Sequence, residues 1–448
     1  MYIVPQYLDS NKIFIVQRSE IEGRLEPEFY KPSIANLEKM IQKKSSHKLR
    51  DYSRSLSGGA TPKKTEGEKF YADKYTGVPF LRVQNLNTDG SLSLDDCLYV
   101  NKETHEGMLQ RSQVAEGDLL VKITGVGRMA IASVAPKGFV GNTNQHLVVI
   151  KTGSTEISKY LARYLNLDIV EKVASRHSTG GTRPALDYPS VKNLPIIEGI
   201  DFSPIDKAIK LKKQKESEAQ QLLDSIDTYI LNELGIILPK IDNNLKCRIF
   251  LSSFKEITGN RLDPYYKLYF NNSYKSVKYD SLRLGNIADI CKGTALTSKD
   301  ITPGNIPVIA GGKSSPYSHN EANFNGNVIT VSASGAYAGY VWYHQNPIFA
   351  TDCSVIVSKD ESLFLTQYIA EVLVSLQTII YRLQVGAAQP HVYPADLMNI
   401  YIPSIPLSQQ EIIVNTTYAI RQRVKQLQEE GKTILENAKK EVERMIIG

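Results

Sequence analysis

The sequence has few of the residues that mark metalloproteins, disulfide-rich proteins and membrane proteins. It contains four cysteines and one tryptophan in 448 residues, and no two of the cysteines, Cys97, Cys247, Cys291 and Cys353, stand at metal-ligand spacing. Cysteines scattered over so long a chain do not indicate a disulfide framework, so we expect a reducing, cytoplasmic location. No apolar run approaches the roughly 20 residues that span a bilayer, and the first residues do not resemble a signal peptide.

The composition is that of a globular protein with a small basic surplus. Hydrophobic residues make up 42% and charged residues 22% of the chain, which is typical of folded domains, and the length allows two or three of them. The net charge of +6 permits a polyanionic partner without requiring one. The 25 tyrosines suit wet interfaces, because each combines an apolar ring with a polar tip, although strand content explains them as well.

The most informative feature is an internal repeat. Landmarks of the first half recur in the same order in the second: residues 24–30 as 261–267, 77–80 as 304–307, 117–125 as 326–335, and 144–151 as 352–359. The last two pairs are short β-branched runs beside Gly-rich or polar turns, which predict strands and loops. Each half then has apolar residues at helical spacing, over 157–175 and 365–384, followed by a Gly- and Pro-containing loop.

Each copy ends in a segment that we predict to be a long helix. Ser203 and Pro204 form a helix start, and the polar stretch 210–218 should face solvent. In the closing segment small or apolar residues recur in steps of three, four and seven, which indicates a heptad seam: Ile420, Val424, Leu427, Gly431, Ile434, Ala438 and Met445. Gly431 and Ala438 would let a partner helix approach closely. We expect the two helices to pair, and the alternative is that each lies on its own domain.

These patterns predict an α+β fold of two globular recognition domains, each of mixed strands and helices, separated by long α-helices. The helices should pair as an antiparallel coiled coil and give the chain a pseudo-two-fold internal repeat. The expected boundaries are a first domain with an N-terminal leader at 1–200, a central spacer helix at 201–250, a second domain at 251–404 and a C-terminal spacer helix at 405–448.

No catalytic motif is evident. The histidines form no metal-binding pattern, and neither a Gly-x-Ser-x-Gly elbow nor a Walker loop is present. Asp263-Pro-Tyr-Tyr266 resembles the Asp-Pro-Pro-Tyr box of DNA amino-methyltransferases, but its counterpart, Glu26-Pro-Glu-Phe29, does not keep that pattern. We therefore predict a non-enzymatic chain with no metal and no cofactor. The alternatives are a methyltransferase or nuclease with unrecognised motifs, and a general nucleic-acid-binding scaffold.

The order of these motifs resembles the specificity subunit of type I restriction–modification systems. The residues that carry the resemblance are the Arg-Leu-Asp/Glu-Pro segments, 57–62, 77–82, the strand and turn at 117–128, Asn144-Gln145, Gln389-Pro390 and 402–411. The resemblance covers essentially the whole chain, and the duplicated order makes it specific. The chain departs from the family at 195–203, where the usual Pro-rich, Gln-containing entry into the helix is replaced.

The resemblance implies a DNA-binding subunit without catalytic activity. In that family each half is a target recognition domain that reads one part of a split DNA sequence, and the helices set the distance between the readers. DNA adenine methyltransferase subunits, two by expectation, dock on the scaffold, and a nuclease–translocase subunit joins for cleavage. The halves of this chain differ around Gly311-Gly312-Lys313, so we expect an asymmetric, bipartite target in double-stranded DNA.

Base reading needs Arg, Lys, Asn or Gln side chains at the base edges, whereas phosphate contacts position the protein. Candidates were chosen in or beside predicted strand-end loops. For the first reader they are Arg82, Gln84, Asn85, Lys122, Thr124, Arg128 and Arg183, and for the second they are Lys292, Lys313, Ser332, Ser334, Tyr337 and Tyr340. Tyr337 and Tyr340 can instead pack against Trp342.

Overall fold

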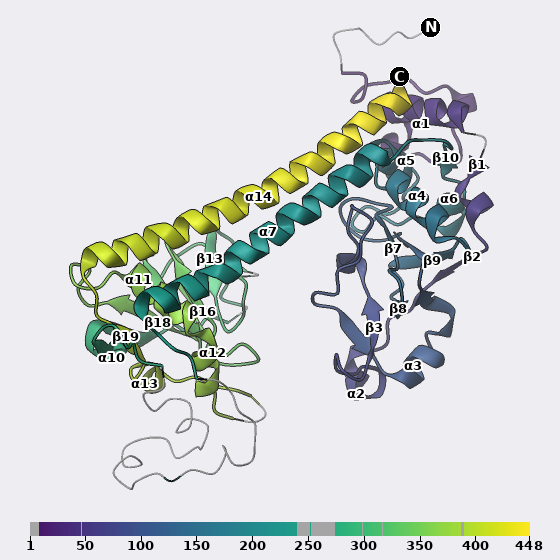
Figure 1. Cartoon of the computed structure of the whole chain (residues 1–448). Coiled ribbons are helices and arrows are strands. Elements are labelled where there is room, and N and C mark those ends of the chain that lie inside the picture. The colour runs from purple at the N-terminus through teal and green to yellow at the C-terminus, as the bar shows by residue number, and fades with distance from the viewer. Residues whose placement is uncertain are drawn as a thin grey trace. The chain divides into compact units, whose positions relative to one another are not determined.

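The chain forms two compact units in a computed structural model that describes residues 9–45, 47–239, 251, 274–297, 299–315, 317–386 and 389–448. Unit 1 consists of Met1–Lys215 and Glu429–Gly448, and unit 2 of Glu216–Gln428 (Figure 1). The repeated motif at 261–267 lies outside the described residues. No helix in the described ranges combines the length and the apolar character needed to cross a membrane.

Unit 1 contains an antiparallel four-stranded sheet that is buried on both faces. Its strands, in spatial order, are β2 (Ser55–Gly58), β9 (Leu147–Lys151), β6 (Leu119–Lys122) and β7 (Ala132–Val134). Along β6, Leu119 and Val121 pack with the helices of the unit, whereas Leu120 packs with the second sheet. This two-sided burial explains why the strand has an uninterrupted aliphatic run instead of alternating polar residues.

A second sheet of unit 1 contains one parallel pair. Its spatial order is β4 (Leu98–Val100), β3 (Val78–Leu81), β8 (Val140–Thr143) and β5 (Gln113–Ala115), with β3 and β8 parallel. A two-stranded sheet pairs β1 (His47–Lys48) with β10 (Pro195–Ile196). The helices are α1 (Pro32–Lys44), α2 (Gly67–Phe70), α3 (Lys102–Glu106), α4 (Thr155–Leu165), α5 (Asp168–Arg176) and α6 (Tyr188–Lys192).

The helical stretch predicted at 157–175 is two helices, α4 and α5. They are separated by Asn166 and Leu167, and Leu167 is extended. The Asn166 side chain accepts a hydrogen bond from the Ala132 backbone N–H at 3.2 Å and donates one to the Ala132 carbonyl at 2.7 Å. These bonds to the edge strand β7 fix the chain where the helix is interrupted, and local periodicity gives no sign of such a distant partner.

Unit 2 repeats the strand order of the antiparallel four-stranded sheet of unit 1, and among its described residues the second sheet has no counterpart of β5. Its four-stranded antiparallel sheet has the order β12 (Ala288–Lys292), β18 (Cys353–Ser358), β15 (Val328–Ser332) and β16 (Val341–His344). A three-stranded sheet consists of β14 (Ser318–His319), β13 (Ile306–Ile309) and β17 (Phe349–Ala350), with β13 and β17 parallel. β11 (Ser281–Arg283) pairs with β19 (Tyr401–Pro403), and the short helices are α10 (Leu284–Ile287), α11 (Thr366–Ser375), α12 (Gln377–Ile380) and α13 (Pro394–Leu397).

The strand pairing also fixes how the two halves correspond. Lys122 at the end of β6 pairs with Leu147, and Ser332 at the end of β15 pairs with Cys353. In addition, Ile123 N–H donates to the His146 carbonyl, as Ala333 N–H does to that of Asp352. Asp352 therefore corresponds to His146, and the sequence alignment that set it against Asn144 was wrong by two residues.

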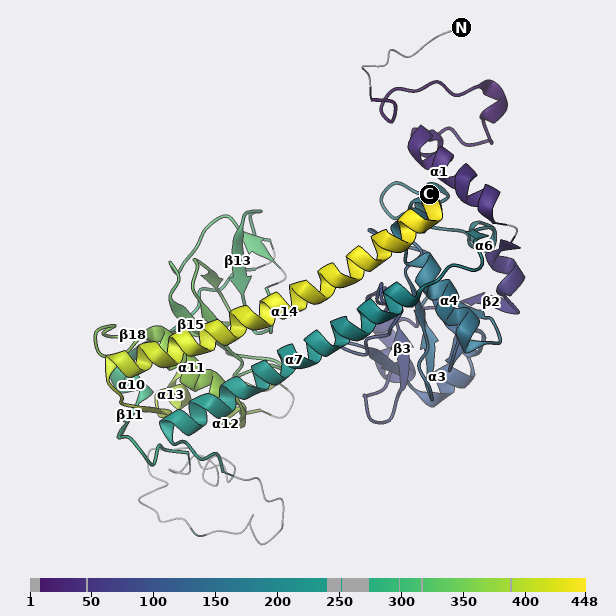
Figure 2. The ribbon, with the colours of Figure 1, turned by 45° about the horizontal axis from the view of Figure 1, so that its top comes forward.

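Two long helices, α7 (Ser203–Leu234) and α14 (Leu407–Ile447), contribute residues to both units. Within unit 1, the Lys215 ammonium forms an ion pair with Glu430, and a Cβ at Gly431 would lie 3.3 Å from Lys212 Cγ. Within unit 2, Ala219 of α7 packs with Val424 and Leu427 of α14. The two helices pack together in each unit (Figure 2), and the close approach predicted at Gly431 is confirmed.

The seam predicted for α14 holds except at its end. Val424, Leu427 and Ala438 are buried, but Met445 is 62% exposed, and Val442 and Ile446 are buried instead. A straight α-helix drifts by about 20° per heptad, so a strict seven-residue step after Ala438 leaves the packed face. In α7 the stretch 210–218 is largely exposed, as predicted.

Candidate nucleic-acid interface

Loops from both sheets of unit 1 meet at one edge. In the first sheet, β2 ends at Gly58 and β6 ends at Lys122, and both ends lie beside the start of β9 at Leu147. In the second sheet, the parallel strands β3 and β8 end at the same edge, at Leu81 and Thr143. The turns 59–62, 82–85, 123–131 and 144–146 follow these ends, and we call them together the unit 1 loop edge. Most residues nominated for the first reader lie on it, because they were chosen at strand ends.

The loop 123–131 is held by contacts at several points. Gly125 N–H donates to the Pro184 carbonyl at 3.0 Å, and Thr124 forms a β-bridge with Ala185. The Lys122 ammonium donates to the Val126 carbonyl at 2.8 Å. These contacts bring the Gly–Pro loop 180–184, with exposed Arg183, to the unit 1 loop edge.

Two nominated residues of unit 1 are in the interior. Lys122 is 2% exposed, and burial lowers its pKa. Asn85 is fully buried, where its amide accepts a hydrogen bond from Arg82 N–H at 2.8 Å and donates one to the Ser93 carbonyl at 3.0 Å. A side chain so buried supports the loop from within and does not reach a base edge without rearrangement.

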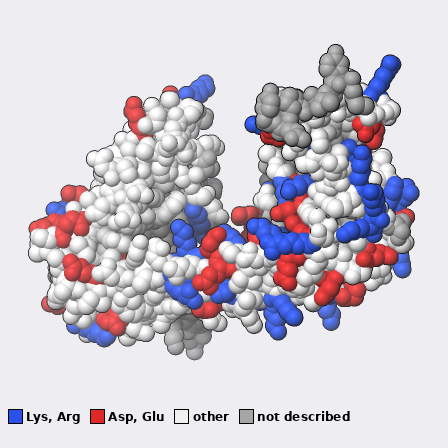
Figure 3. All heavy atoms as spheres, turned by 90° about the horizontal axis from the view of Figure 1, so that it is seen from above, with Lys and Arg blue, Asp and Glu red and all other residues white. Residues whose placement is uncertain are grey.

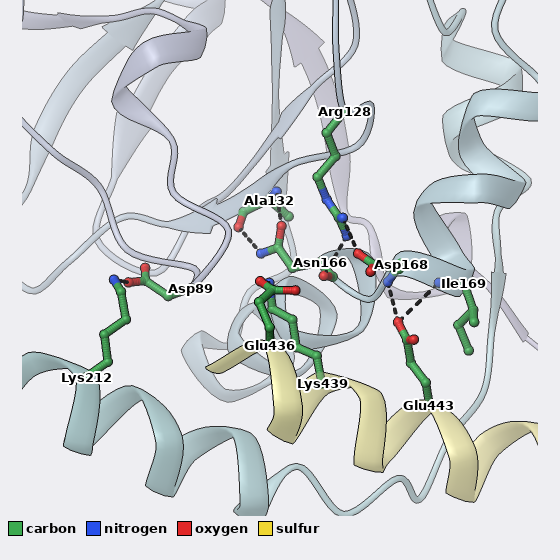
Figure 4. A network of polar contacts seen from close by, with 10 residues as sticks. All are labelled: Asp89, Arg128, Ala132, Asn166, Asp168, Ile169, Lys212, Glu436, Lys439 and Glu443. Atoms are coloured by element: carbon green, nitrogen blue, oxygen red, sulfur yellow. Dashed lines mark hydrogen bonds and ion pairs between the residues drawn. The ribbon is translucent and has the colours of Figure 1, made fainter. Parts of the chain in front are cut away.

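Arg128 contacts the protein itself. Its guanidinium forms an ion pair with Asp168 and donates to the Asn166 carbonyl at 2.6 Å (Figure 4). From the helix side, the Glu443 carboxylate of α14 accepts the backbone N–H groups of Asp168 and Ile169 at the start of α5. The loop, α5 and the last part of α14 thus form one polar network in unit 1.

The other nominated residues of unit 1 are more accessible. Gln84 and Arg183 are exposed, and Thr124 is half-buried. Arg82 is half-buried and donates to the Asp96 carbonyl at 2.6 Å. Exposed amide and guanidinium groups are those that make two-point hydrogen bonds to adenine and guanine in the major groove, so Gln84 and Arg183 have the chemistry and the exposure needed for base contact.

Unit 2 has a corresponding loop edge, where β12 ends at Lys292, β15 at Ser332 and β17 at Ala350. A groove of about 400 Å³ opens there. Its polar and aromatic lining consists of Lys292, Thr297, Thr351, Asp352, Ser354, His391 and Tyr393. Ser332 is buried and lies beneath this edge. The turns 293–297, 310–315, 333–340 and 351–352 follow these strand ends and that of β13, and we call them together the unit 2 loop edge.

Three nominated residues of unit 2 form a cation–aromatic cluster. The Lys313 ammonium lies 4.7 Å from the centroid of the Tyr337 ring and 5.6 Å from that of Tyr340. Such contacts are attractive because the ring face is electron-rich. The Trp342 ring instead lies 4.8 Å from that of His344. Lys313 is exposed and Tyr337 is 42% exposed, so the cluster presents a charge and a hydroxyl to solvent.

The sequence did not identify every polar group at these edges. Asp352 accepts a hydrogen bond from the Ser334 hydroxyl. The rings of His391 and Tyr393 stack at 6.1 Å beside the groove. In unit 1, exposed Gln145 bonds to Thr61. The Gly–Pro loops indicated where the chain turns, but the spacing of residues does not tell which side chains of a turn face outward.

Charge is distributed unevenly over the surface. On the face seen in Figure 3, Lys and Arg side chains of unit 1 gather among Asp and Glu, whereas the surface of unit 2 is mostly uncharged. An extended face of one positive sign would indicate binding dominated by phosphate contacts, whereas this face of unit 1 carries both signs of charge.

Among the described residues, no group of three or more His, Cys, Asp or Glu is placed to hold a metal ion.

The chain thus has two units of mixed helices and largely antiparallel sheets, which share the strand order of their antiparallel four-stranded sheet and carry unlike polar loops at the same sheet edge. The family model for the type I restriction modification DNA specificity domain matches residues 276–436. This segment, which includes the unit 2 loop edge and most of α14, is similar to that domain. Over these residues the match agrees with the family that the sequence motifs predicted.

Solved structures of type I restriction–modification S subunits align with most of the chain, at low sequence identity. The type I restriction–modification S subunit from M. genitalium is 14% identical, with 87% of this chain and 94% of that chain covered and a TM-score of 0.40. The HsdS subunit from Thermoanaerobacter tengcongensis is 14% identical, with 89% and 95% covered and a TM-score of 0.35. With TM-scores below 0.5, these structural alignments carry no argument about the function of the chain. No curated protein sequence matches significantly.

Proposed function

We propose that the chain is a non-catalytic, sequence-specific DNA-binding subunit of a type I restriction–modification complex. One observation carries the proposal: a specificity-domain match at 276–436 falls on a unit whose strand order is repeated in the other half of the chain. A duplicated reader has a simple use, which is to gather sequence information from two separate parts of one DNA target. The reaction itself belongs to other subunits.

The two loop edges support an asymmetric bipartite target. The unit 1 loop edge presents Gln84 and Arg183, whereas the unit 2 loop edge presents Lys313 with two tyrosines and a groove containing His391. Donors and acceptors of different geometry select different base edges. Each unit therefore reads its own half-site, and the target is not a palindrome.

The long helices are the proposed scaffold for partners. They act as an antiparallel coiled coil that relates the two readers by a pseudo-two-fold and sets the spacing of the half-sites. Exposed apolar residues on α14, Ile412 at 60% and Tyr418 at 52%, are of the kind that a partner covers. The partners are DNA adenine methyltransferase subunits, two in number, with nuclease–translocase subunits for cleavage, in the cytoplasm. The chain needs no cofactor of its own.

Selection from a pool of random DNA duplexes tests this function. The full chain is mixed with the methyltransferase subunits encoded with it, and bound duplexes are sequenced. We expect one interrupted sequence with two unlike parts. Enrichment of no sequence would instead identify a general nucleic-acid scaffold, and transfer of methyl groups to DNA by the chain alone would identify an enzyme. Either result would end the proposal.

A further inference from the structure

We propose that Val126 is a specificity-determining residue that reads the C5-methyl group of a thymine. The inference rests on the proposed function, since it names the chemistry by which unit 1 recognises one base. Sequence reasoning did not select this residue, because base reading by hydrogen bonds directs attention to polar side chains. The structure directs attention to it because Val126 is 77% exposed at the unit 1 loop edge.

The backbone around Val126 is built as a tight turn. Gly125 and Gly127 have φ angles of 118° and 80°, a region that side-chain-bearing residues rarely adopt. A Cβ at Gly127 would meet nothing within 4 Å, and at Gly125 the nearest atom would be Lys122 Cε at 3.7 Å. The glycines are therefore needed for conformation and not for space. The turn places a stiff, β-branched apolar side chain between them.

Three polar groups next to Val126 are already used inside the protein. Its own carbonyl accepts a hydrogen bond from Lys122, Gly125 N–H is bonded to Pro184, and Arg128 is paired with Asp168. The side chain that the tip of the turn presents to a ligand is an exposed isopropyl group. Single exposed apolar residues are common on protein surfaces. This one differs because these three contacts fix the turn that carries it, so little conformational entropy is lost when it binds.

The major groove of DNA offers one apolar group to such a side chain. This group is the methyl at C5 of thymine, and protein apolar contacts to it discriminate thymine from cytosine. Arg128 and Lys122, which were predicted to read bases, become positioning residues that hold the turn. At the corresponding turn of unit 2, Gly335 is followed by Ala336 and Tyr337, with Lys313 beside the tyrosine. The branched apolar side chain at the tip of the turn is thus a feature of unit 1, whereas unit 2 has the smaller Ala336 beside a tyrosine.

Replacement of each thymine of the selected target by deoxyuridine, one position at a time, tests the inference. Deoxyuridine removes the methyl group and keeps the base pair. For the full chain with its methyltransferase subunits, we expect one position where the change weakens binding about fourfold, the factor for one buried methyl group. Val126→Ala should bind thymine and deoxyuridine duplexes equally at that position, with a melting temperature close to that of the wild type.

Val140→Ala is the matched control, because Val140 is 54% exposed in the same unit but lies at the other end of β8. It should keep the fourfold discrimination. Equal binding of wild-type protein to every deoxyuridine duplex would overturn the inference, as would discrimination that survives in Val126→Ala or a selected target without thymine. All three results leave the proposed function intact, whereas failure to select any sequence would end the proposed function.

Discussion

At the scale of single residues, the two arginines nominated in unit 1 differ in what they contact. Arg128 is bound to Asp168 and to the Asn166 carbonyl, and Arg183 is exposed on the loop at the unit 1 loop edge. A guanidinium engaged by an internal carboxylate stabilises the fold, whereas an exposed one is available to a polyanion. We therefore expect substitution of Arg128 to change the stability of the protein and substitution of Arg183 to change its binding to DNA.

Arg128→Met should lower the free energy of unfolding by about 1–2 kcal/mol, because it removes charge-assisted hydrogen bonds from a partly exposed pair. Arg183→Met should change stability by less than about 0.5 kcal/mol and weaken binding to the selected DNA. Denaturant titration measures the first quantity and fluorescence anisotropy the second. Equal stability of the two variants would show that the Arg128 network contributes nothing to the fold.

A second prediction concerns Asp89, which is 7% exposed. Burial by itself would raise the pKa of this carboxyl group, but hydrogen bonds from Lys212 at 2.8 Å and from Ser91 lower it from 3.8 to about 2. A carboxyl group with a lowered folded-state pKa contributes stability above its unfolded pKa, and this contribution is lost as the pH falls. The shift corresponds to about 2 kcal/mol near neutral pH.

The pH dependence of unfolding for wild type and Asp89→Asn measures this contribution. The wild type should be more stable near neutral pH, and the difference should shrink as the pH falls from about 4 to about 2. Subtracting the variant removes the effect of the other carboxyl groups, which titrate in both proteins. A difference that stays constant over this range would show that Asp89 does not have a lowered pKa.

The candidate site was predicted in part at this scale. The sequence identified strand ends and the Gly–Pro loops, and it correctly placed Gln84, Arg183 and Lys313 in exposed turns. It did not show that Lys122 and Ser332 are buried. Each is the last residue of a strand, and whether such a side chain faces the interior depends on pairing with a distant strand. Val126 was passed over because an apolar residue in a turn has no polar signal.

At the scale of elements, the starts of the long helices followed from local patterns, whereas α7 ends at Leu234 and not at the predicted residue 250. Ser203 begins α7, and the apolar steps after Ile420 mark the packed face of α14. The interruption at Asn166 did not follow, because its cause is a pair of hydrogen bonds to Ala132 in a strand. The spacing of apolar residues within a segment indicates which face of a helix is buried. Where the helix is interrupted depends on contacts with other segments of the chain.

The helix pair of unit 2 gives a prediction at this scale. Leu427 is fully buried with Ala219 and Val424, whereas Ile412 on the same helix is 60% exposed. Leu427→Ala should destabilise the protein by about 2–5 kcal/mol, because it leaves a cavity in packed apolar surroundings. Ile412→Ala should cost less than about 0.5 kcal/mol. Thermal or denaturant unfolding checks both, and similar losses would contradict the packing of α7 on α14 at this position.

At the scale of the whole molecule, the duplication predicted the main result, which is two units of mixed strands and helices whose antiparallel four-stranded sheets have the same strand order. The duplication did not, however, predict which residues of the two halves correspond to one another. Between the end of β8 and the start of β9 the chain has three residues, 144–146, whereas between β17 and β18 it has two, Thr351 and Asp352. A single deletion in a loop leaves the motif order intact but shifts the alignment of side chains, and strand pairing is needed to detect it.

Two units with separate cores should contribute independently to DNA affinity. The apolar clusters of unit 1 and unit 2 share no residue. We expect Gln84→Ala and Lys313→Ala each to weaken binding by about 1–3 kcal/mol, the range for one base contact, and each to relax a different half of the target. The double variant should lose the sum within about 0.5 kcal/mol, because substitutions in separate units that share no described contact partner are expected to be additive.

Titration of the selected duplex and of duplexes altered in one half measures all four terms of this cycle. Lys425→Ala is the control for loss of charge, because Lys425 is exposed on α14 and belongs to neither loop edge. It should leave the preference for either half unchanged, since an exposed helix charge contributes at most a sequence-independent phosphate contact. If either single variant relaxed both halves, or if the double variant lost much less than the sum, the units would not read DNA separately. The bipartite target would then have to arise from one composite surface, and the duplication would need another explanation.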